Sequence, residues 1–151
     1  MGYFYILLPD LLDKVTFNRI KDSNRIVIIM SKSFYSALGE ERLSSLLDCF
    51  YDKVFSNPII SHLFANTPKE EIKRKQHLFL TQFLGGPAAY TEQIGQPKMR
   101  QRHIPHKITV EAKDEWLKCM KEAIYELDWD NANKEALYNC FPLVAQHMVN
   151  S

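Results

Sequence analysis

The amino-acid sequence predicts an all-α fold. Along several long segments, apolar residues recur at intervals of three and four, which is the spacing of one face of a helix. Residues that end helices, such as Asn57-Pro58 and Gly85-Gly86, separate these segments. After Met30 the sequence lacks the alternation of apolar and polar residues that is typical of a strand. We therefore expect one helical domain with four substantial helices.

The composition is that of an ordinary globular protein. The chain has 151 residues, of which 46% are hydrophobic and 25% charged, so one domain can bury a sizeable core. A formal net charge of +1 argues against a nucleic-acid partner, and no apolar run approaches the length of a membrane span. The chain has three cysteines, Cys49, Cys119 and Cys140, and no CxxC motif. An odd number cannot pair completely in disulfides, which favours the reducing cytoplasm.

Residues 1–29 differ from the rest of the chain. Two short apolar runs, YFYILL and RIVII, flank polar residues, and neither a basic region nor a small-residue cleavage site marks a signal peptide. Ile6 stands where a myristoylation signal requires Ser or Thr. We expect residues 1–29 to be a dispensable N-terminal extension and residues 30–151 to form the folded domain.

The first long helix is predicted between Gly39 and Phe55. Its inner face is apolar except for Tyr51, which places a hydroxyl among carbon side chains; the face comprises Leu43, Leu46, Leu47, Phe50, Tyr51, Val54 and Phe55. Asn57-Pro58 ends this helix and caps a short one that ends at Phe64.

The second long helix is predicted to begin at Thr67-Pro68, with Thr67 as the N-cap. Glu70 and Glu71 complement the helix dipole in its first turn, and Gly85-Gly86-Pro87 ends the helix. One amide interrupts its inner face, which comprises Ile72, Gln76, Phe79, Leu80 and Phe83.

The second half of the chain is predicted to begin with a loop over residues 87–96. Pro97 then starts a short helical turn that ends near His103, and Thr109 caps a helix with an inner face of Ala112, Trp116, Cys119, Met120, Ala123, Ile124 and Leu127. A last helical segment, 132–149, carries Leu137, Phe141, Val144 and Met148 on one face. Pro142 should kink or interrupt it, because proline removes one backbone hydrogen bond.

Each polar residue on these faces has a structural explanation when it is taken alone. Tyr51 and Trp116 are common types of core residue, and Gln76 could lie at the edge of its face. His103 could be an ordinary structural histidine. With His106 it forms an HxxH pair that could hold zinc, but no cysteine or carboxylate cluster accompanies the pair.

Taken together, the same residues indicate a ligand. Tyr51, Gln76 and Trp116 are costly to bury unpaired, so we expect them to converge on a shared polar guest. Dioxygen on ferrous iron fits, because it carries partial negative charge. If each hydrogen bond contributes ~1.5 kcal/mol, two would slow its release by about a hundredfold. His103, at the end of a short helical turn and ahead of Pro105, suits the axial ligand of a haem.

Residues 50–147 closely resemble a truncated haemoglobin of the second group, one of the short globins whose two-over-two helical sandwich encloses a haem pocket. The matching strings, in order along the chain, are FYDKV (50–54), RKQHLFLTQFLGGP (74–87), YTEQIGQPKMRQRH (90–103), ITVEAKDEWLKCM (108–120) and HMVN (147–150).

This resemblance implies a haem b cofactor and a role for each matching residue. His103 matches the proximal iron ligand. The distal hydrogen-bond donors match Tyr51, Gln76 and Trp116. The aromatic contacts to the porphyrin match Phe64 and Phe79, and the positions near the propionates, where cationic and hydroxyl groups pair with carboxylates, match Lys75, Tyr90 and Arg102.

The chain departs from the family pattern at a few positions. Ile72 stands where the family usually has a small or hydroxyl side chain at the distal entrance, and its bulk should narrow that route. The loop before Ile72 is one residue longer than usual, and Ile94 and Gln96 replace common histidines. His77, next to Gln76, is a weak candidate for a second axial ligand.

Three functions are compatible with these residues. The first is reversible, high-affinity binding of dioxygen and other diatomic ligands. The second is nitric-oxide dioxygenation or peroxide reduction on the same haem, which would need an external reductase because no flavin or nicotinamide domain is recognisable in the chain. The third is a haem-free helical interaction module, which a purified protein without a Soret band would favour.

Overall fold

A computed structural model describes residues 33–151, and the regular structure of this part of the chain is helical throughout, without a strand. The all-α prediction is therefore confirmed. The helices, in chain order, are α2 (Phe34–Leu38), α3 (Glu40–Ser56), η1 (Ser61–Phe64), α4 (Lys69–Phe83), α5 (Ala89–Gln93), α6 (Met99–His103), α7 (Val110–Tyr125), α8 (Asn131–Tyr138) and α9 (Pro142–Met148).

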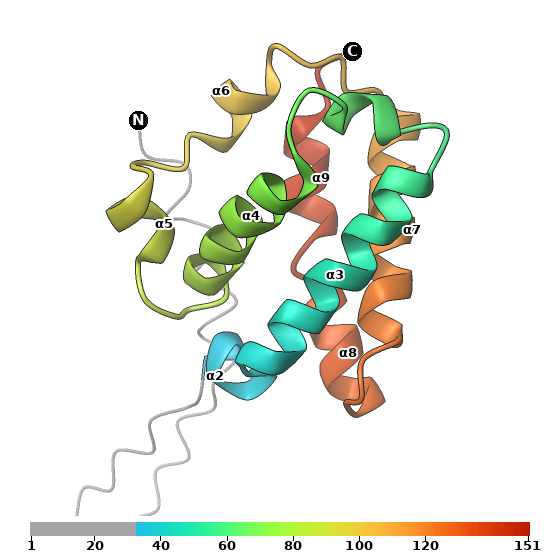
Figure 1. Ribbon diagram of the computed structural model, residues 1–151. Coiled ribbons are helices and arrows are strands. Elements are labelled where there is room, and N and C mark those ends of the chain that lie inside the picture. Colours follow the sequence, from blue (N-terminus) through green and yellow to red (C-terminus); the bar gives the residue numbers. More distant parts are fainter. Residues whose placement is uncertain (1–32) are drawn as a thin grey trace, which may run out of the picture. The chain divides into compact units, whose positions relative to one another are not determined.

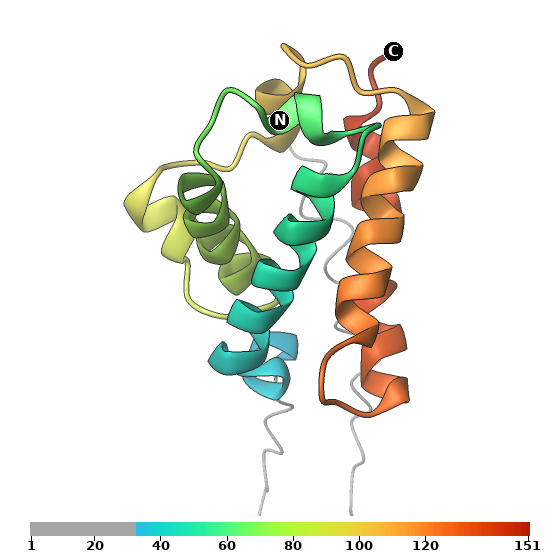
Figure 2. The same cartoon turned by 45° about the vertical axis from the view of Figure 1, so that its right-hand side comes forward.

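The long helices form two layers (Figures 1 and 2). One layer holds α3 and α4, and the other holds α7 with α8 and α9; α3 packs against α4 within its layer and against α7 across the interface. This is the two-over-two sandwich that the resemblance predicts. The short helices α5 and α6 follow α4 and lead the chain toward α7.

The core lies between α3 and α7, and the predicted apolar faces supply it. Leu43, Leu46, Phe50 and Val54 of α3 are completely buried, as are Met120, Ala123 and Ile124 of α7. Burial of each large apolar side chain contributes about 1.5–3 kcal/mol, so this interface is the main source of stability for the layers.

Two of the predicted helix boundaries depend on side-chain caps that the structure contains. Asn57 Oδ1 accepts hydrogen bonds from the backbone N–H groups of Ile59 and Ile60, at 2.9 and 3.3 Å, and so links the end of α3 to η1. Thr109 Oγ1 accepts from the N–H of Ala112 at 3.1 Å and caps α7. The predicted end of α3 at Asn57 and the predicted cap of α7 are confirmed, whereas η1 begins after Ile60 and has no side-chain cap of its own, so the prediction that Asn57 caps it is wrong.

The prediction that Thr67 caps α4 is wrong. Pro68 occupies the N-cap position, with extended backbone at ψ 136°, and no side chain caps this helix. The hydroxyl of Thr67 precedes that position by one residue, too early to satisfy the first free N–H groups of the helix. Glu70 and Glu71 do lie in the first turn, as predicted.

The end of α4 is fixed by its two glycines. Gly85 has a φ of +89°, which side chains disfavour, and its N–H donates to Gln82 O at 3.2 Å. The N–H of Gly86 donates to Thr81 O at 2.8 Å, which completes a Schellman motif. A Cβ on Gly86 would lie only 2.6 Å from the ring of Tyr35, so glycine at this position allows the Tyr35 ring to pack against the backbone.

The predicted loop over 87–96 contains the short helix α5, which sequence reasoning missed. Gln82 of α4 stabilises it: its Nε2 donates to Thr91 Oγ1, and its Oε1 accepts from the N–H of Thr91, both at 2.9 Å. Contacts from a neighbouring helix thus override a local composition of proline, glycine and alanine.

Pro142 interrupts the last helical segment, as predicted. It is the first residue of α9, where the N–H that proline lacks would have had no partner within the helix, and the chain turns between α8 and α9. No helix formed by residues 33–151 is long and apolar enough to cross a membrane. The expected extension, 1–29, lies outside the described residues.

Candidate functional site

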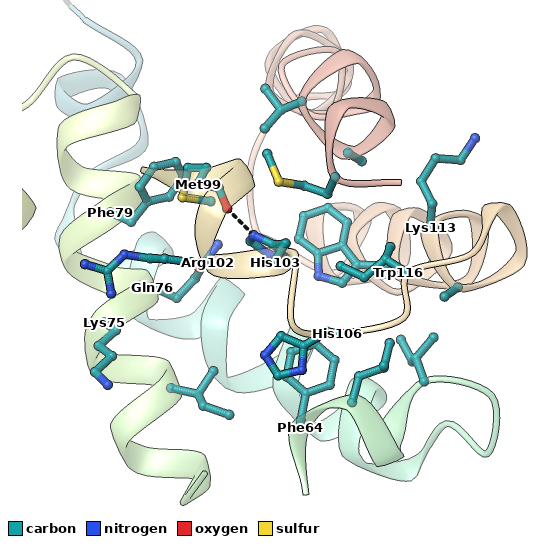
Figure 3. A pocket seen from close by; sticks show the side chains of 18 of the residues that line it. Phe64, Lys75, Gln76, Phe79, Met99, Arg102, His103, His106, Lys113 and Trp116 are labelled. Atoms are coloured by element: carbon teal, nitrogen blue, oxygen red, sulfur yellow. Dashed lines mark hydrogen bonds between the residues drawn. The ribbon is translucent and has the colours of Figure 1, made fainter. Parts of the chain in front are cut away.

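A cavity of about 350 Å³ lies between the two layers, bounded by α3, η1, α4, α5, α6, α7 and α9. Its volume is in the range of small-molecule sites. All ten residues that the sequence nominated line this single cavity: Tyr51, Phe64, Ile72, Lys75, Gln76, Phe79, Tyr90, Arg102, His103 and Trp116. Figure 3 shows several of them in position.

His103 is the last residue of α6, and its ring is oriented by the backbone one turn earlier. Its Nδ1 lies 2.6 Å from Met99 O (Figure 3). Because a carbonyl can only accept, Nδ1 carries the proton and donates it. In the neutral tautomer with this hydrogen bond, Nε2 carries the lone pair that can bind a metal, which is the arrangement that orients metal-ligating histidines.

Tyr51 is a buried residue whose hydroxyl opens onto the same cavity. The residue is only 3% exposed, and its hydroxyl makes no hydrogen bond to another of residues 33–151. Burial raises the pKa of Tyr51 well above its ordinary value, so the hydroxyl keeps its proton and remains a donor. The hydroxyl opens onto the cavity, where it is available to donate a hydrogen bond to a guest.

Gln76 and Trp116 reach the cavity from opposite layers. Gln76 lies on α4 beside Lys75, whereas Trp116 lies on α7 across the cavity, with its indole packed edge-on against Phe50 at a centroid distance of 5.1 Å. Of the residues drawn in Figure 3, only His103 and Met99 share a hydrogen bond. Neither the amide of Gln76 nor the indole N–H of Trp116 makes a hydrogen bond to another of residues 33–151, so both are available as donors.

Aromatic rings form much of the remaining wall. Phe64 of η1 meets the ring of Tyr51 edge-on at 6.3 Å. Phe79 stacks on Phe83 at 5.5 Å and meets Tyr90 edge-on at 6.0 Å. Such flat apolar surfaces suit a planar aromatic guest.

Two cations lie together at one side of the cavity. Lys75 and Arg102 occupy the same side as Gln76 in Figure 3. The Arg102 guanidinium lies 5.7 Å from the centre of the Tyr90 ring, and its Nε donates to Pro97 O at 2.9 Å. Lys75 pairs with Glu71 at 2.6 Å, an exposed helix-surface pair that contributes little and leaves the ammonium accessible.

The cavity is also lined by residues that sequence analysis did not predict to be site residues, among them Met99, His106, Ile108, Lys113 and Met148. Lys113 could have been found, because it precedes Trp116 by three residues and so shares its helix face. Met99 gave no such indication, since its role depends on its carbonyl rather than its side chain.

Two alternatives gain no support from the geometry. Among residues 33–151 no group of three or more His, Cys, Asp and Glu side chains could hold a metal ion, so His103 and His106 remain an incomplete zinc set. His77 does not line the cavity; its Nε2 lies 2.6 Å from Glu40 Oε1 at the start of α3.

The cavity residues fit a haem. A histidine with a free Nε2 can bind the iron, aromatic walls can hold the porphyrin, and two cations can pair with its propionates. The unpaired Tyr51 hydroxyl can bond a ligand on the iron. A two-over-two helical sandwich around such a pocket defines a globin-type haem-binding protein.

Comparisons with known proteins identify the family. The family model for bacterial-like globins matches residues 33–150. The group 2 truncated hemoglobin YjbI of Bacillus subtilis (strain 168) is 46% identical over 124 residues, which cover 80% of this chain and 93% of that protein. The chain therefore belongs to the bacterial-like globins, and among them it is a truncated haemoglobin of the second group.

Solved structures agree with this assignment. The truncated oxygen-avid haemoglobin from Bacillus subtilis superposes with a TM-score of 0.74 at 45% identity, over 79% of this chain and all of that one. The group II truncated hemoglobin from Bacillus anthracis gives a TM-score of 0.75 at 38% identity, over 80% and 93% of the two chains. Membership of the globin family implies a haem cofactor.

Proposed function

We propose that this protein binds dioxygen and other diatomic ligands reversibly and with high affinity on a haem b. His103 would hold the iron through Nε2, and the sequence contains no CxxC motif through which haem could be attached covalently. Phe64 and Phe79 would contact the porphyrin, and Lys75, Tyr90 and Arg102 would meet the propionates. The haem supplies a ferrous iron that binds diatomic molecules.

The observation that carries this proposal is that the hydroxyl of the buried residue Tyr51 opens onto the same cavity as Nε2 of His103. A dioxygen ligand carries partial negative charge, which a protonated hydroxyl stabilises. Gln76 and Trp116 would add further donors. A similar haemoglobin from Bacillus subtilis is itself described as oxygen-avid, which supports the same function here.

Ile72 would set how quickly ligands enter. It lines the cavity from α4, and its branched side chain is stiff. We propose that it narrows the distal route, so that slow ligand entry accompanies slow release.

The replacement Tyr51→Phe tests the proposal, because it removes only the hydroxyl. Loss of one hydrogen bond of ~1.5 kcal/mol should speed dioxygen dissociation about tenfold, as measured by stopped-flow mixing of the oxygenated protein with dithionite. A dissociation rate equal to that of the unaltered protein would assign the stabilisation to Gln76 and Trp116 instead and would refute the role of Tyr51.

A redox function on the same haem is the second candidate, and the convergence of three donors on one cavity favours it, because donors also polarise a bound ligand. Nitric-oxide dioxygenation or peroxide reduction would then require electrons from an external reductase. Multiple turnovers of nitric oxide on addition of a reductase would select this function. We place either activity in the cytoplasm, where the three cysteines stay reduced.

A further inference from the structure

The last residues of the chain cross the loop that follows His103 and are tied to it. Asn150 makes four hydrogen bonds there. Its N–H donates to Ile108 O at 3.0 Å, and its Oδ1 accepts from the N–H of Ile108 at 3.1 Å. Its Nδ2 donates both to His103 O, at 3.1 Å, and to His106 O, at 2.9 Å.

These bonds are long-range, whereas the loop has few of its own. Asn150 lies 47 residues after His103 and 42 after Ile108. Within the loop, the N–H of His106 donates to His103 O at 3.0 Å, and Pro105 has no N–H to offer. The side chain and backbone of Asn150 therefore supply much of the hydrogen bonding that fixes residues 103–108.

Helix α6 needs such an anchor. It spans only five residues, Met99–His103, and a helix this short is not stable by itself. The carbonyls at its C-terminal end have no partner within the helix, and Asn150 Nδ2 binds the last of them. Arg100, on the same helix, donates to His147 O of α9, which gives a second tie between the two segments.

We propose that Asn150 is a positioning residue for His103, an inference that rests on the proposed role of His103 as iron ligand. Met99 O fixes the rotation of the imidazole, and Asn150 fixes the backbone that carries it. Together they hold Nε2 in one place relative to the cavity. Partners of this kind, one step removed from the metal, tune metal affinity as the ligands do.

The test compares Asn150→Ala, Asn150→Asp and the control Asn139→Ala in the haem-loaded protein. Asn150→Asp keeps an acceptor for the N–H of Ile108 but loses both Nδ2 donors. Asn139 is also exposed and lies at the end of α8, away from the cavity. Since Asn150 and Asn139 are exposed and lie outside the buried core, all three variants should keep the long helices α3, α4 and α7.

The readouts are the iron–histidine stretching band of the ferrous protein in resonance Raman spectra and the rate of haem transfer to apomyoglobin. In both Asn150 variants the band should shift or broaden, and haem loss should accelerate about tenfold. Asn139→Ala should change neither. An unaltered band and rate in both Asn150 variants would overturn the positioning role while leaving the proposed function intact. Absence of an iron–histidine band from the unaltered protein would overturn the ligand assignment and this inference with it.

Discussion

At the residue scale, the site is defined by which polar groups already have a partner and which do not. His103 Nδ1 donates a hydrogen bond to Met99 O, so Nε2 is the ring nitrogen left to bind a metal. Tyr51 is a buried residue whose hydroxyl opens onto the cavity, and its raised pKa keeps that hydroxyl protonated across the physiological range. In the function proposed above, the first group would bind the iron and the second would donate a hydrogen bond to its ligand.

Replacing His103 and His106 one at a time should show which of the two binds the haem iron. His103→Ala removes the proposed axial ligand, so the haem content of the purified protein should fall to a small fraction of normal. His106→Ala is the matched control, because His106 lines the same cavity three residues later. Haem content is measured as the pyridine haemochromogen. Equal haem retention by the two variants would contradict the ligand assignment.

The three cysteines take no part in the chemistry of the site. All three are free thiols in the described part of the chain. Burial, with the nearby Glu126 carboxylate, raises the pKa of Cys49 to about 11, and burial alone raises that of Cys140 to about 11. At neutral pH these two thiols therefore remain uncharged and unreactive, as buried cysteines that only fill space do.

The residues that line the cavity could largely be predicted from the sequence, some from periodicity and the others from the family resemblance. Tyr51, Gln76 and Trp116 stand out because each interrupts or completes an apolar helix face, which fixes the direction of its side chain. The pairing of His103 with Met99 O could not be predicted, since it depends on a side-chain rotamer. The ties of Asn150 to His103 and Ile108 were equally hidden, because they join segments more than 40 residues apart.

At the scale of the elements, boundaries are decided by where a capping atom can reach. Thr109 and Thr67 both precede predicted helices, yet only the hydroxyl of Thr109 accepts from a free N–H of its helix. Sequence alone cannot distinguish the two threonines. If the helix begins one residue later than predicted, the hydroxyl no longer reaches a free backbone N–H group in its first turn. The same limit applies to α5, whose stability comes from Gln82 on α4 and not from its own residues.

The two threonines provide a matched test of this account. Thr109→Ala should lower the free energy of unfolding by about 1 kcal/mol, because a helix cap is lost, and should lower the Tm by about 4 °C. Thr67→Ala should leave the unfolding free energy nearly unchanged. Thermal and urea unfolding followed by circular dichroism measure both effects. If Thr67→Ala were the more destabilising of the two, the boundary of α4 described above would be wrong.

At the scale of the whole molecule, two layers of helices enclose one cavity to which most of the chain contributes. The long faces of α3, α4 and α7 could be predicted because their apolar periods extend over several turns. The cavity itself could not, because residues as far apart as Tyr51 and Met148 meet only when the layers pack. Family resemblance supplied that arrangement, and the two-over-two fold agrees with it.

The division into an extension and a globin domain remains a proposal at this scale. The family match begins at residue 33, close to the predicted boundary at Met30. A protein that begins at Met30 should therefore fold with unchanged helix content and the same haem absorption spectrum as the full chain. Gel filtration and circular dichroism check the fold. Insolubility or loss of haem in the shortened protein would show that residues 1–29 are required.

The most direct test of the central claim is the absorption spectrum of the purified full-length protein in its ferric form, after anaerobic reduction, and again after admission of air. We expect a Soret band in every form, and an oxygenated spectrum that forms on exposure to air and persists. A protein without a Soret band, or one that air converts at once to the ferric form, would contradict the claim that this chain is a haem protein that binds dioxygen reversibly.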